Sequence, residues 1–361
     1  MIRTPTRLLF DRGMFQSTQA TDQDETRGHL TMKRLLGTYL FQCIQYTGLM
    51  PVVRYLFAGR VVILMFHEIQ VEPRSELMTG TSIPLLEYAL DWLRQNQYQI
   101  ITLDKYLQDR VLETTDSSRY AILTFDDGYR DNVTVGLPIL ERYNAPFVMY
   151  VPTGSPLRTL NSWWLGLREL VRRNDQISIE AMNHFPCGDF RQKLAALANV
   201  TKWIHADYSR IAILDVALKK AGISVTALNN AYFLDEAELQ ALSRHPLASL
   251  GGHTTSHAAL ATLTAASARA EMADNREYLQ DLTQAPVRHF AYPYGAYSRR
   301  EQSLAEELGF STAVTATKGH LDPRQSPYSL PRIPVDRTPI VFQARMNGAE
   351  FAVYRLLGMS A

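Results

Sequence analysis

Along most of the chain, short apolar runs alternate with longer segments whose apolar residues recur every three or four positions. Short runs bounded by Gly, Pro, Asn or Asp predict strands, whereas the longer pattern predicts helices. The predicted strands are residues 63–66, 99–102, 122–125, 147–151, 247–251 and 310–315, and the predicted helices are residues 84–95, 103–109, 137–143 and 265–282. This alternation predicts a parallel sheet or barrel.

One long segment interrupts the alternation, from about residue 156 to residue 232. It contains the run Trp-Trp-Leu-Gly-Leu at residues 163–167 and continues as a helical stretch of mixed charge. The core pattern resumes at Leu234, where Asp235 begins a helix. We therefore expect an inserted helical subdomain.

The two ends of the chain have a different character. Residues 1–31 are polar and mixed, which indicates a disordered tail or an overlong gene start with Met32 as the initiator. Residues 32–59 predict an amphipathic helical segment, packed on the outside of the fold or touching a membrane. No signal peptide is evident, so we expect a cytoplasmic protein, at the inner membrane face in the second case. Residues 346–361 are expected to form a C-terminal tail.

Composition fits a soluble protein with one large domain. Hydrophobic residues make up 46% of the 361 residues and charged residues 20%, enough for a substantial core. The net charge of +1 gives no reason to expect a nucleic-acid partner. Cys43 and Cys187 form no disulfide framework, so a reducing compartment is permitted.

Two segments more than a hundred residues apart suggest a metal site. The apolar strand at 122–125 ends in Asp126 and Asp127, whose mutual repulsion a cation would relieve; an acidic turn is the alternative. His253 and His257 are four residues apart, which would place both rings on one face of a helical turn. One Asp and two His are three ligands, the number that a catalytic zinc site uses. Surface or helix-capping histidines are the alternative.

Two aromatic segments are further candidates. Residues 289–292 predict a short strand that runs into the turn Pro293-Tyr294-Gly295, whose backbone N–H groups could face an oxyanion; an ordinary strand exit is the alternative. Trp163 and Trp164 could stack on sugar rings or pack between helices.

Together these motifs resemble the polysaccharide deacetylases of the NodB-homology type, carbohydrate esterase family 4. The matching segments are TFDDG at 124–128, HTTSH at 253–257, AYPYG at 291–295 and, upstream, LMFHEI at 64–69. The resemblance covers about residues 60 to 340. It implies a distorted (β/α)7-type barrel over residues 60–345, with the inserted subdomain and a site at the C-terminal ends of the strands.

The resemblance also implies roles for single residues. Asp127, His253 and His257 would hold a divalent metal ion, with zinc as the expected ion. Asp126 would act as the general base, and the backbone N–H of Tyr294 would bind the oxyanion. Four aromatic or cyclic side chains are candidates for substrate contact, namely Tyr129, Trp163, Trp164 and Pro293.

The sequence departs from the family pattern at two positions. Ala291 stands where the family has an Arg that braces the base. Arg332, which follows the last predicted strand, could replace it, or could be a surface arginine. No His follows His320, so the usual C-terminal general acid is missing. His67, at the end of the strand ending at Phe66, is the candidate substitute; a structural His is the alternative.

The expected function is the metal-dependent removal of N-acetyl groups from an amino-sugar polysaccharide or its precursor, with an N-acetylated glycan as the partner. No organic cofactor is implied. An acetyl esterase or amidase acting on another carbohydrate or small amide is the second possibility. The third is a glycan-binding protein that kept the fold without the activity.

Overall fold

The computed structural model describes residues 58–70, 77, 80–109, 118–182, 184–322 and 324–351, together with residues 48, 52, 53 and 55. The chain divides into two units, of which one spans residues 59–346 and contains all the elements named below. The predicted N-terminal tail, most of the segment 32–59 and residues 352–361 of the predicted C-terminal tail lie outside the described residues, whereas residues 346–351 are described. Among the described helices, none has the length and hydropathy needed to cross a bilayer.

Seven parallel strands close into a barrel, in the order β1-β12-β11-β10-β9-β6-β5 and back to β1. The strands are β1 (Val61–Phe66), β5 (Arg119–Asp126), β6 (Phe147–Val151), β9 (Ala248–Gly252), β10 (His289–Ala291), β11 (Thr312–Lys318) and β12 (Leu330–Pro334). An eighth strand, β4 (Tyr98–Ile100), pairs only with the first half of β5, before β6 begins to pair with it. The predicted seven-stranded type of barrel is confirmed.

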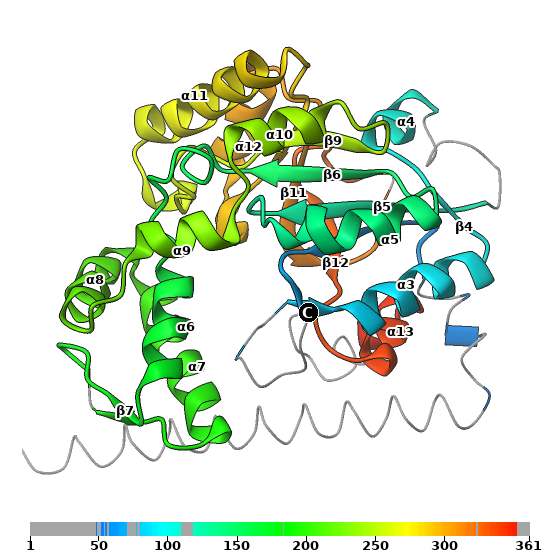
Figure 1. Ribbon diagram of the computed structural model, residues 1–361. Coiled ribbons are helices and arrows are strands. Elements are labelled where there is room, and N and C mark those ends of the chain that lie inside the picture. The colour runs from blue at the N-terminus through cyan, green and yellow to red at the C-terminus, as the bar shows by residue number, and fades with distance from the viewer. Residues whose placement is uncertain are drawn as a thin grey trace, which may run out of the picture. The chain divides into compact units, whose positions relative to one another are not determined.

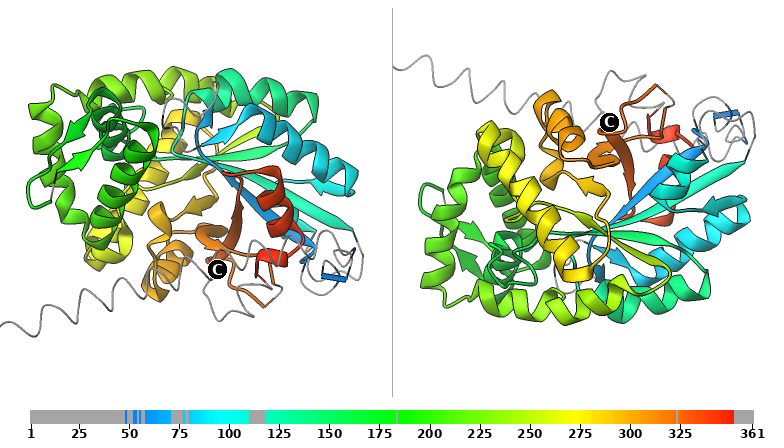
Figure 2. Two further views of the ribbon diagram at one scale, coloured as in Figure 1. Left: turned by 90° about the horizontal axis from the view of Figure 1, so that it is seen from below. Right: turned by 90° about the horizontal axis from the view of Figure 1, so that it is seen from above.

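Helices surround the strands (Figures 1 and 2). The helices outside the insertion are α3 (Ile83–Gln95), α4 (Leu103–Gln108), α5 (Leu137–Arg142), α10 (Glu236–Ser243), α11 (Ala265–Thr283), α12 (Arg299–Glu307) and α13 (Pro339–Met346). In β1, Leu64 and Phe66 belong to the same apolar cluster as the buried face of α3, whereas Ile63 belongs to a separate cluster with residues of other strands. Alternate residues of each strand therefore face the helices and the barrel interior.

The same alternation brings polar groups into the interior at the C-terminal half of two strands. In β5, Ile122 lies in the interior cluster, so Thr124 and Asp126 follow it on the same face. In β12, Leu330 lies in that cluster and Arg332 follows it. The barrel therefore changes from apolar to charged along its axis, toward the end where sites of this architecture lie.

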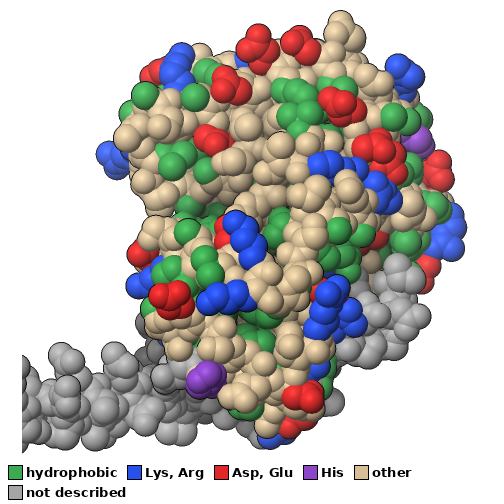
Figure 3. All heavy atoms as spheres, turned by 60° about the vertical axis from the view of Figure 1, so that its left-hand side comes forward, with side chains coloured by type: hydrophobic (Ala, Val, Ile, Leu, Met, Phe, Trp, Pro, Cys, Tyr) green, Lys and Arg blue, Asp and Glu red, His purple; other side chains and the backbone are tan. Residues whose placement is uncertain are grey.

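The predicted insertion forms a subdomain with its own core, on one side of the barrel (Figure 1). Its elements are α6 (Trp163–Arg173), β7 (Gln176–Ile177), β8 (Phe185–Pro186), α7 (Phe190–Ala206), α8 (Ile211–Lys220) and α9 (Val225–Tyr232). Val171, Val200 and Leu214, from three different helices, are completely buried within it. On the face where this subdomain comes forward, basic, acidic and hydrophobic side chains are interspersed (Figure 3).

Several elements were not predicted, among them β12, α12 and α13. Arg332 follows the last predicted strand, residues 310–315, as expected, but it lies in the middle of a further strand, β12, that the sequence did not predict. The sequence Leu-Pro-Arg-Ile-Pro did not indicate a strand, because proline cannot donate to a ladder. Helix α12 was missed although Ser298 and Glu301 form a capping box at its start, which is a readable signal.

Candidate metal and catalytic site

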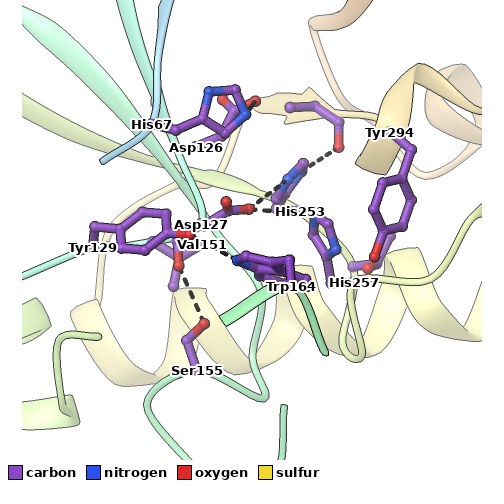
Figure 4. A network of polar contacts seen from close by, with 12 residues as sticks. His67, Asp126, Asp127, Tyr129, Val151, Ser155, Trp164, His253, His257 and Tyr294 are labelled. Carbon is purple, nitrogen blue, oxygen red and sulfur yellow. Dashed lines mark hydrogen bonds and ion pairs between the residues drawn. The ribbon is translucent and has the colours of Figure 1, made fainter. Parts of the chain in front are cut away.

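Asp127, His253 and His257 come together at the C-terminal ends of β5 and β9 (Figure 4). Nε2 of His253 lies 3.4 Å from Oδ1 of Asp127, and Nε2 of His257 lies 3.3 Å from the same oxygen. All three residues are buried, and one possible ligand atom from each lies within 4.8 Å of the others. Among the described residues, this is the only cluster of at least three His, Cys, Asp or Glu with that geometry.

The backbone around the three side chains is strained. Asp127 has φ 74°, Thr254 φ 64° and His257 φ 57°, a left-handed conformation that is uncommon outside glycine; Asp and His adopt it more readily than most residues, but for the β-branched Thr254 it is an outlier. The helical turn predicted for residues 253–257 is therefore wrong; the segment is an irregular loop. The loop brings the two rings together, whereas the i, i+4 argument assumed a helix. Strain of this kind is typical of functional sites.

The hydrogen bonding of His253 leaves Nε2 free to bind a cation. Its Nδ1 lies 2.7 Å from the carbonyl oxygen of Ala291, which can only accept, so Nδ1 carries the proton. In the neutral ring Nε2 then presents a lone pair to Asp127, whose Oδ1 is buried and has no hydrogen-bond partner among the described residues. A lone pair facing a carboxylate oxygen requires a cation between them, and imidazole nitrogen with carboxylate oxygen suits zinc.

The charge state of the cluster also fits a metal. Burial raises the pKa of Asp127, but the two His side chains more than offset this effect and hold the pKa well below its usual value. Burial lowers the pKa of His257 in spite of the neighbouring carboxylate. Metal ligands must be deprotonated, and these shifts favour an ionised Asp and a neutral His at neutral pH.

Asp126 is held from inside the barrel by Arg332. The guanidinium nitrogens Nη1 and Nη2 donate hydrogen bonds of 2.7 Å to Oδ1 and Oδ2 of the carboxylate. Arg332 is 1% exposed and also donates to the carbonyl oxygen of Thr315 and to the hydroxyl of Thr124. The surface alternative for Arg332 is thereby excluded. Burial raises the pKa of Asp126, but the charge and hydrogen bonds of Arg332 outweigh it and lower the pKa.

His67 stands beside the same carboxylate. It follows the last residue of β1, and its Nε2 lies 3.7 Å from Oδ2 of Asp126 (Figure 4). Its side chain is 44% exposed, so it can exchange protons with solvent or substrate. In Figure 4 its ring lies beside Asp126 and apart from His257. His67 therefore shares the site with Asp126, without belonging to the cluster that could hold a metal ion.

A cavity of about 380 Å³ opens over these groups. Its walls include Met65, His67, Leu77, Asp126, Asp127, Trp163, Trp164, Leu167, Arg168, Leu197, Thr201, His205, His253, His257, Tyr292, Tyr294, Gly295, Ala316 and Arg332. Helices α6 and α7 thus supply a wall that faces the barrel end. The motifs pointed only to the two Trp in this wall; Arg168 and His205 were missed, and no sequence signal distinguishes them from ordinary helix residues.

The four candidates for substrate contact divide into two pairs. Trp163 and Trp164 both line the cavity, although Trp163 is only 2% exposed. Tyr129 and Pro293 are buried and are not among the cavity residues. Tyr129 instead accepts a hydrogen bond of 2.8 Å from Nε1 of Trp164, so it supports the wall from behind. Direct substrate contact by Tyr129 or Pro293 has no support in this geometry.

Comparison with known families identifies the chain. The family profile "Polysaccharide deacetylase" matches residues 113–205 and 209–313, more than half of the sequence. The chain belongs to the polysaccharide deacetylase family. The resemblance drawn from the motifs is confirmed, and so is the enzyme class, a hydrolase of linear amide bonds.

Two relatives show how far the similarity extends. The protein YxkH of Bacillus subtilis (strain 168), named as a polysaccharide deacetylase, is 20% identical over 300 residues, which are 82% of this chain and 76% of that protein. The poly-beta-1,6-N-acetyl-D-glucosamine N-deacetylase of Escherichia coli (strain K12) is 22% identical over 279 residues, 77% of this chain. The match spans only 37% of the E. coli protein.

Solved structures share the fold. The Streptococcus pyogenes deacetylase PplD, in complex with acetate, superposes with a TM-score of 0.52 at 18% identity, covering 77% of this chain and 92% of that one. IcaB from Ammonifex degensii also gives a TM-score of 0.52, at 16% identity, covering 81% and 98%. These likenesses establish the barrel and leave the substrate to be argued from the site.

Proposed function

We propose that this protein is a metal-dependent deacetylase that removes N-acetyl groups from an amino-sugar polysaccharide or its precursor. The observation that carries the proposal is one cavity that joins a three-residue metal cluster to a braced carboxylate and an exposed imidazole. Amide hydrolysis needs this combination: an activated water, a base that receives its proton, and an acid for the departing nitrogen.

Asp127, His253 and His257 would hold the cation. Zinc is the expected ion, because the donor set is two imidazole nitrogens and one carboxylate oxygen, and His253 is oriented by a backbone carbonyl. When bound, such an ion lowers the pKa of a water molecule and polarises a carbonyl oxygen.

Proton transfer would be divided between two side chains of this chain. Asp126, which Arg332 keeps ionised, takes the proton of the attacking water. His67, 3.7 Å from Asp126, donates a proton to the sugar nitrogen as acetate is released. The backbone N–H of Tyr294, in the turn that follows β10, would stabilise the negative charge on the acetyl oxygen.

Two further observations favour an N-acetylated sugar as substrate. The E. coli relative is named for N-deacetylation of poly-beta-1,6-N-acetyl-D-glucosamine. The partly exposed Trp164 on the cavity wall offers a ring face on which a sugar ring could stack.

A cytoplasmic location stays a prediction. Membrane contact through residues 32–59 also stays one, and the comparisons give it no support.

The test is acetate release from N-acetylglucosamine oligomers by the zinc-loaded protein. We expect release from the oligomers, little release from acetylated xylan, and release from the oligomers at least about a hundredfold slower in a zinc-loaded Asp126→Asn control. Release from acetylated xylan alone would favour the esterase. A protein that binds the oligomers and zinc but releases no acetate from any substrate would overturn the proposal.

A further inference from the structure

One helix of the inserted subdomain is bonded to three different loops of the barrel. The helix is α6, and the bonds are Trp163 Nε1 to the hydroxyl of Tyr294 (3.0 Å), Trp164 Nε1 to the hydroxyl of Tyr129 (2.8 Å), and Arg168 Nη1 and Nη2 to the carboxylate of Glu68 (2.6 and 3.0 Å). Because the three donor residues lie within six positions of one helix, their backbone positions are fixed relative to one another.

Each of the three loops carries a group of the proposed mechanism. Tyr294 is itself the candidate oxyanion donor, and Tyr129 lies two residues after Asp127. Glu68 directly follows His67. Helix α6 therefore contacts the loops after β10, β5 and β1 next to the groups that would react with substrate.

The contact with Glu68 differs in kind from the other charged contacts of the helix. The side chains of Arg168 and Glu68 are 11% and 4% exposed, and the guanidinium lies 5.0 Å from the ring centre of Tyr232. On the same helix, Arg172 forms an equally bidentate pair with Glu169, but Arg172 is 50% exposed. A buried pair contributes more to a defined geometry than to net stability, because desolvation offsets its attraction.

The buried pair fixes the position of Glu68, the residue directly after His67. The carbonyl oxygen of Glu68 accepts a hydrogen bond of 2.8 Å from the N–H of Thr81, so both its backbone and its side chain are held. A Cβ at Gly80 would lie 1.9 Å from that oxygen, which shows how closely the two segments approach. His67 lies between strand β1 and this fixed residue, and its ring makes no hydrogen bond among the described residues; its contact with Asp126, at 3.7 Å, is longer than a hydrogen bond.

We propose that Arg168 is a positioning residue: through Glu68 it orients His67 toward the leaving nitrogen of the substrate. The proposal rests on the proposed function, in which His67 is the acid. It gives the inserted subdomain a part in the reaction, because a residue of α6 would set the orientation in which His67 donates its proton to the leaving nitrogen.

The test compares an amide with an activated ester, since only a poor leaving group needs a proton. In zinc-loaded Arg168→Met, we expect turnover of an N-acetylglucosamine oligomer to fall by at least about tenfold, because small displacements of a catalytic group are costly. Turnover of 4-nitrophenyl acetate and zinc affinity should change less than about twofold. Arg168→Lys, which keeps the charge, should recover part of the amide activity. Arg172→Met, at the exposed pair, should match wild type on both substrates.

A second variant covers the case in which Arg168→Met fails to fold, because it leaves Glu68 buried and unpaired. The pair Arg168→Met with Glu68→Gln removes both charges and nearly keeps the volume, and should show the same selective loss. Unchanged amide turnover, or equal losses on amide and ester, in either folded variant would overturn the inference. His67→Ala separates this failure from that of the proposed function: if His67→Ala also keeps amide turnover, His67 is not the acid.

Discussion

The guanidinium of Arg332 donates two hydrogen bonds of 2.7 Å to the two carboxylate oxygens of Asp126. The two residues come from β12 and β5, which are not neighbours but lie on either side of β1. In barrels the inward side chains of alternate strands share a layer, and this pair is such a contact. The brace that Ala291 cannot provide is thus supplied from another strand.

Replacement of the proposed base should remove turnover without removing the site. For Asp126→Asn we expect a loss on the order of 10² to 10⁴ in kcat on an N-acetylated oligomer, the usual contribution of a general base. Zinc content, measured on the purified protein, should equal that of wild type, because Asp126 is not in the ligand cluster. Wild-type turnover in this variant would require a different base.

The brace predicts a change in pH dependence. Arg332 lowers the pKa of Asp126 against the opposing effect of burial, so Arg332→Gln should raise that pKa. A base must be ionised to act; the acidic limb of kcat/KM should therefore move to higher pH, and the loss should be larger at pH 6 than at pH 8. An equal loss at every pH would contradict this account of the pair.

The same shift makes a prediction for stability. A carboxylate whose pKa is lower in the folded protein stabilises it above the pKa of the unfolded chain, and the effect is lost as the pH falls through the folded value. Wild type should lose stability on acidification below about pH 4, near the unfolded Asp pKa. At neutral pH, Arg332→Gln should lower the free energy of unfolding by about 3–5 kcal/mol, because it leaves a buried charge unpaired. Urea unfolding of wild type and of Arg332→Gln, at pH 7 and at acidic pH, would measure both effects.

Metal removal should be equivalent to the loss of one ligand. His253→Ala should lose the thermal stabilisation that added zinc gives to wild type, which is about 2.7 kcal/mol at a hundredfold excess over Kd. His245→Ala is the matched control, since His245 is paired with Glu141 outside the cluster. Calorimetric titration with zinc distinguishes the two variants. If His253→Ala bound zinc as tightly as wild type, the assignment of His253 as a ligand would be wrong.

The sequence was sufficient for the parts of the site that depend on strand ends. Asp126 and Asp127 directly follow an apolar run, so their place at a barrel rim follows from periodicity. The two His were paired for the wrong reason, because Thr254 and His257 have positive φ and no helical turn forms. Strain of this kind is set by tertiary contacts and leaves no local signal.

Periodicity and spacing alone did not predict contacts between distant segments. The contact of Arg332 with Asp126, 206 residues away, was expected only as a replacement for the arginine of the family pattern, and nothing near Arg332 in the sequence indicates a strand. Arg168 lies 100 residues from Glu68 and resembles the exposed Arg172 in sequence context. Arg168 and Arg172 carry the same charge and lie four positions apart on one helix. Only the fold of the insertion decides which of the two is buried.

The most demanding prediction concerns His67, whose Nε2 lies 3.7 Å from Oδ2 of Asp126. An amine leaves poorly unless it is protonated, whereas 4-nitrophenolate leaves without help. His67→Ala should therefore reduce hydrolysis of an N-acetylglucosamine oligomer by about 10² or more and reduce that of 4-nitrophenyl acetate far less. Zinc affinity should be unchanged, because Nε2 faces Asp126 rather than the ligand cluster. His184→Ala, a change at an exposed His of the insertion, is the control and should leave both rates intact. Parallel losses on the two substrates would make His67 a structural residue at the end of β1.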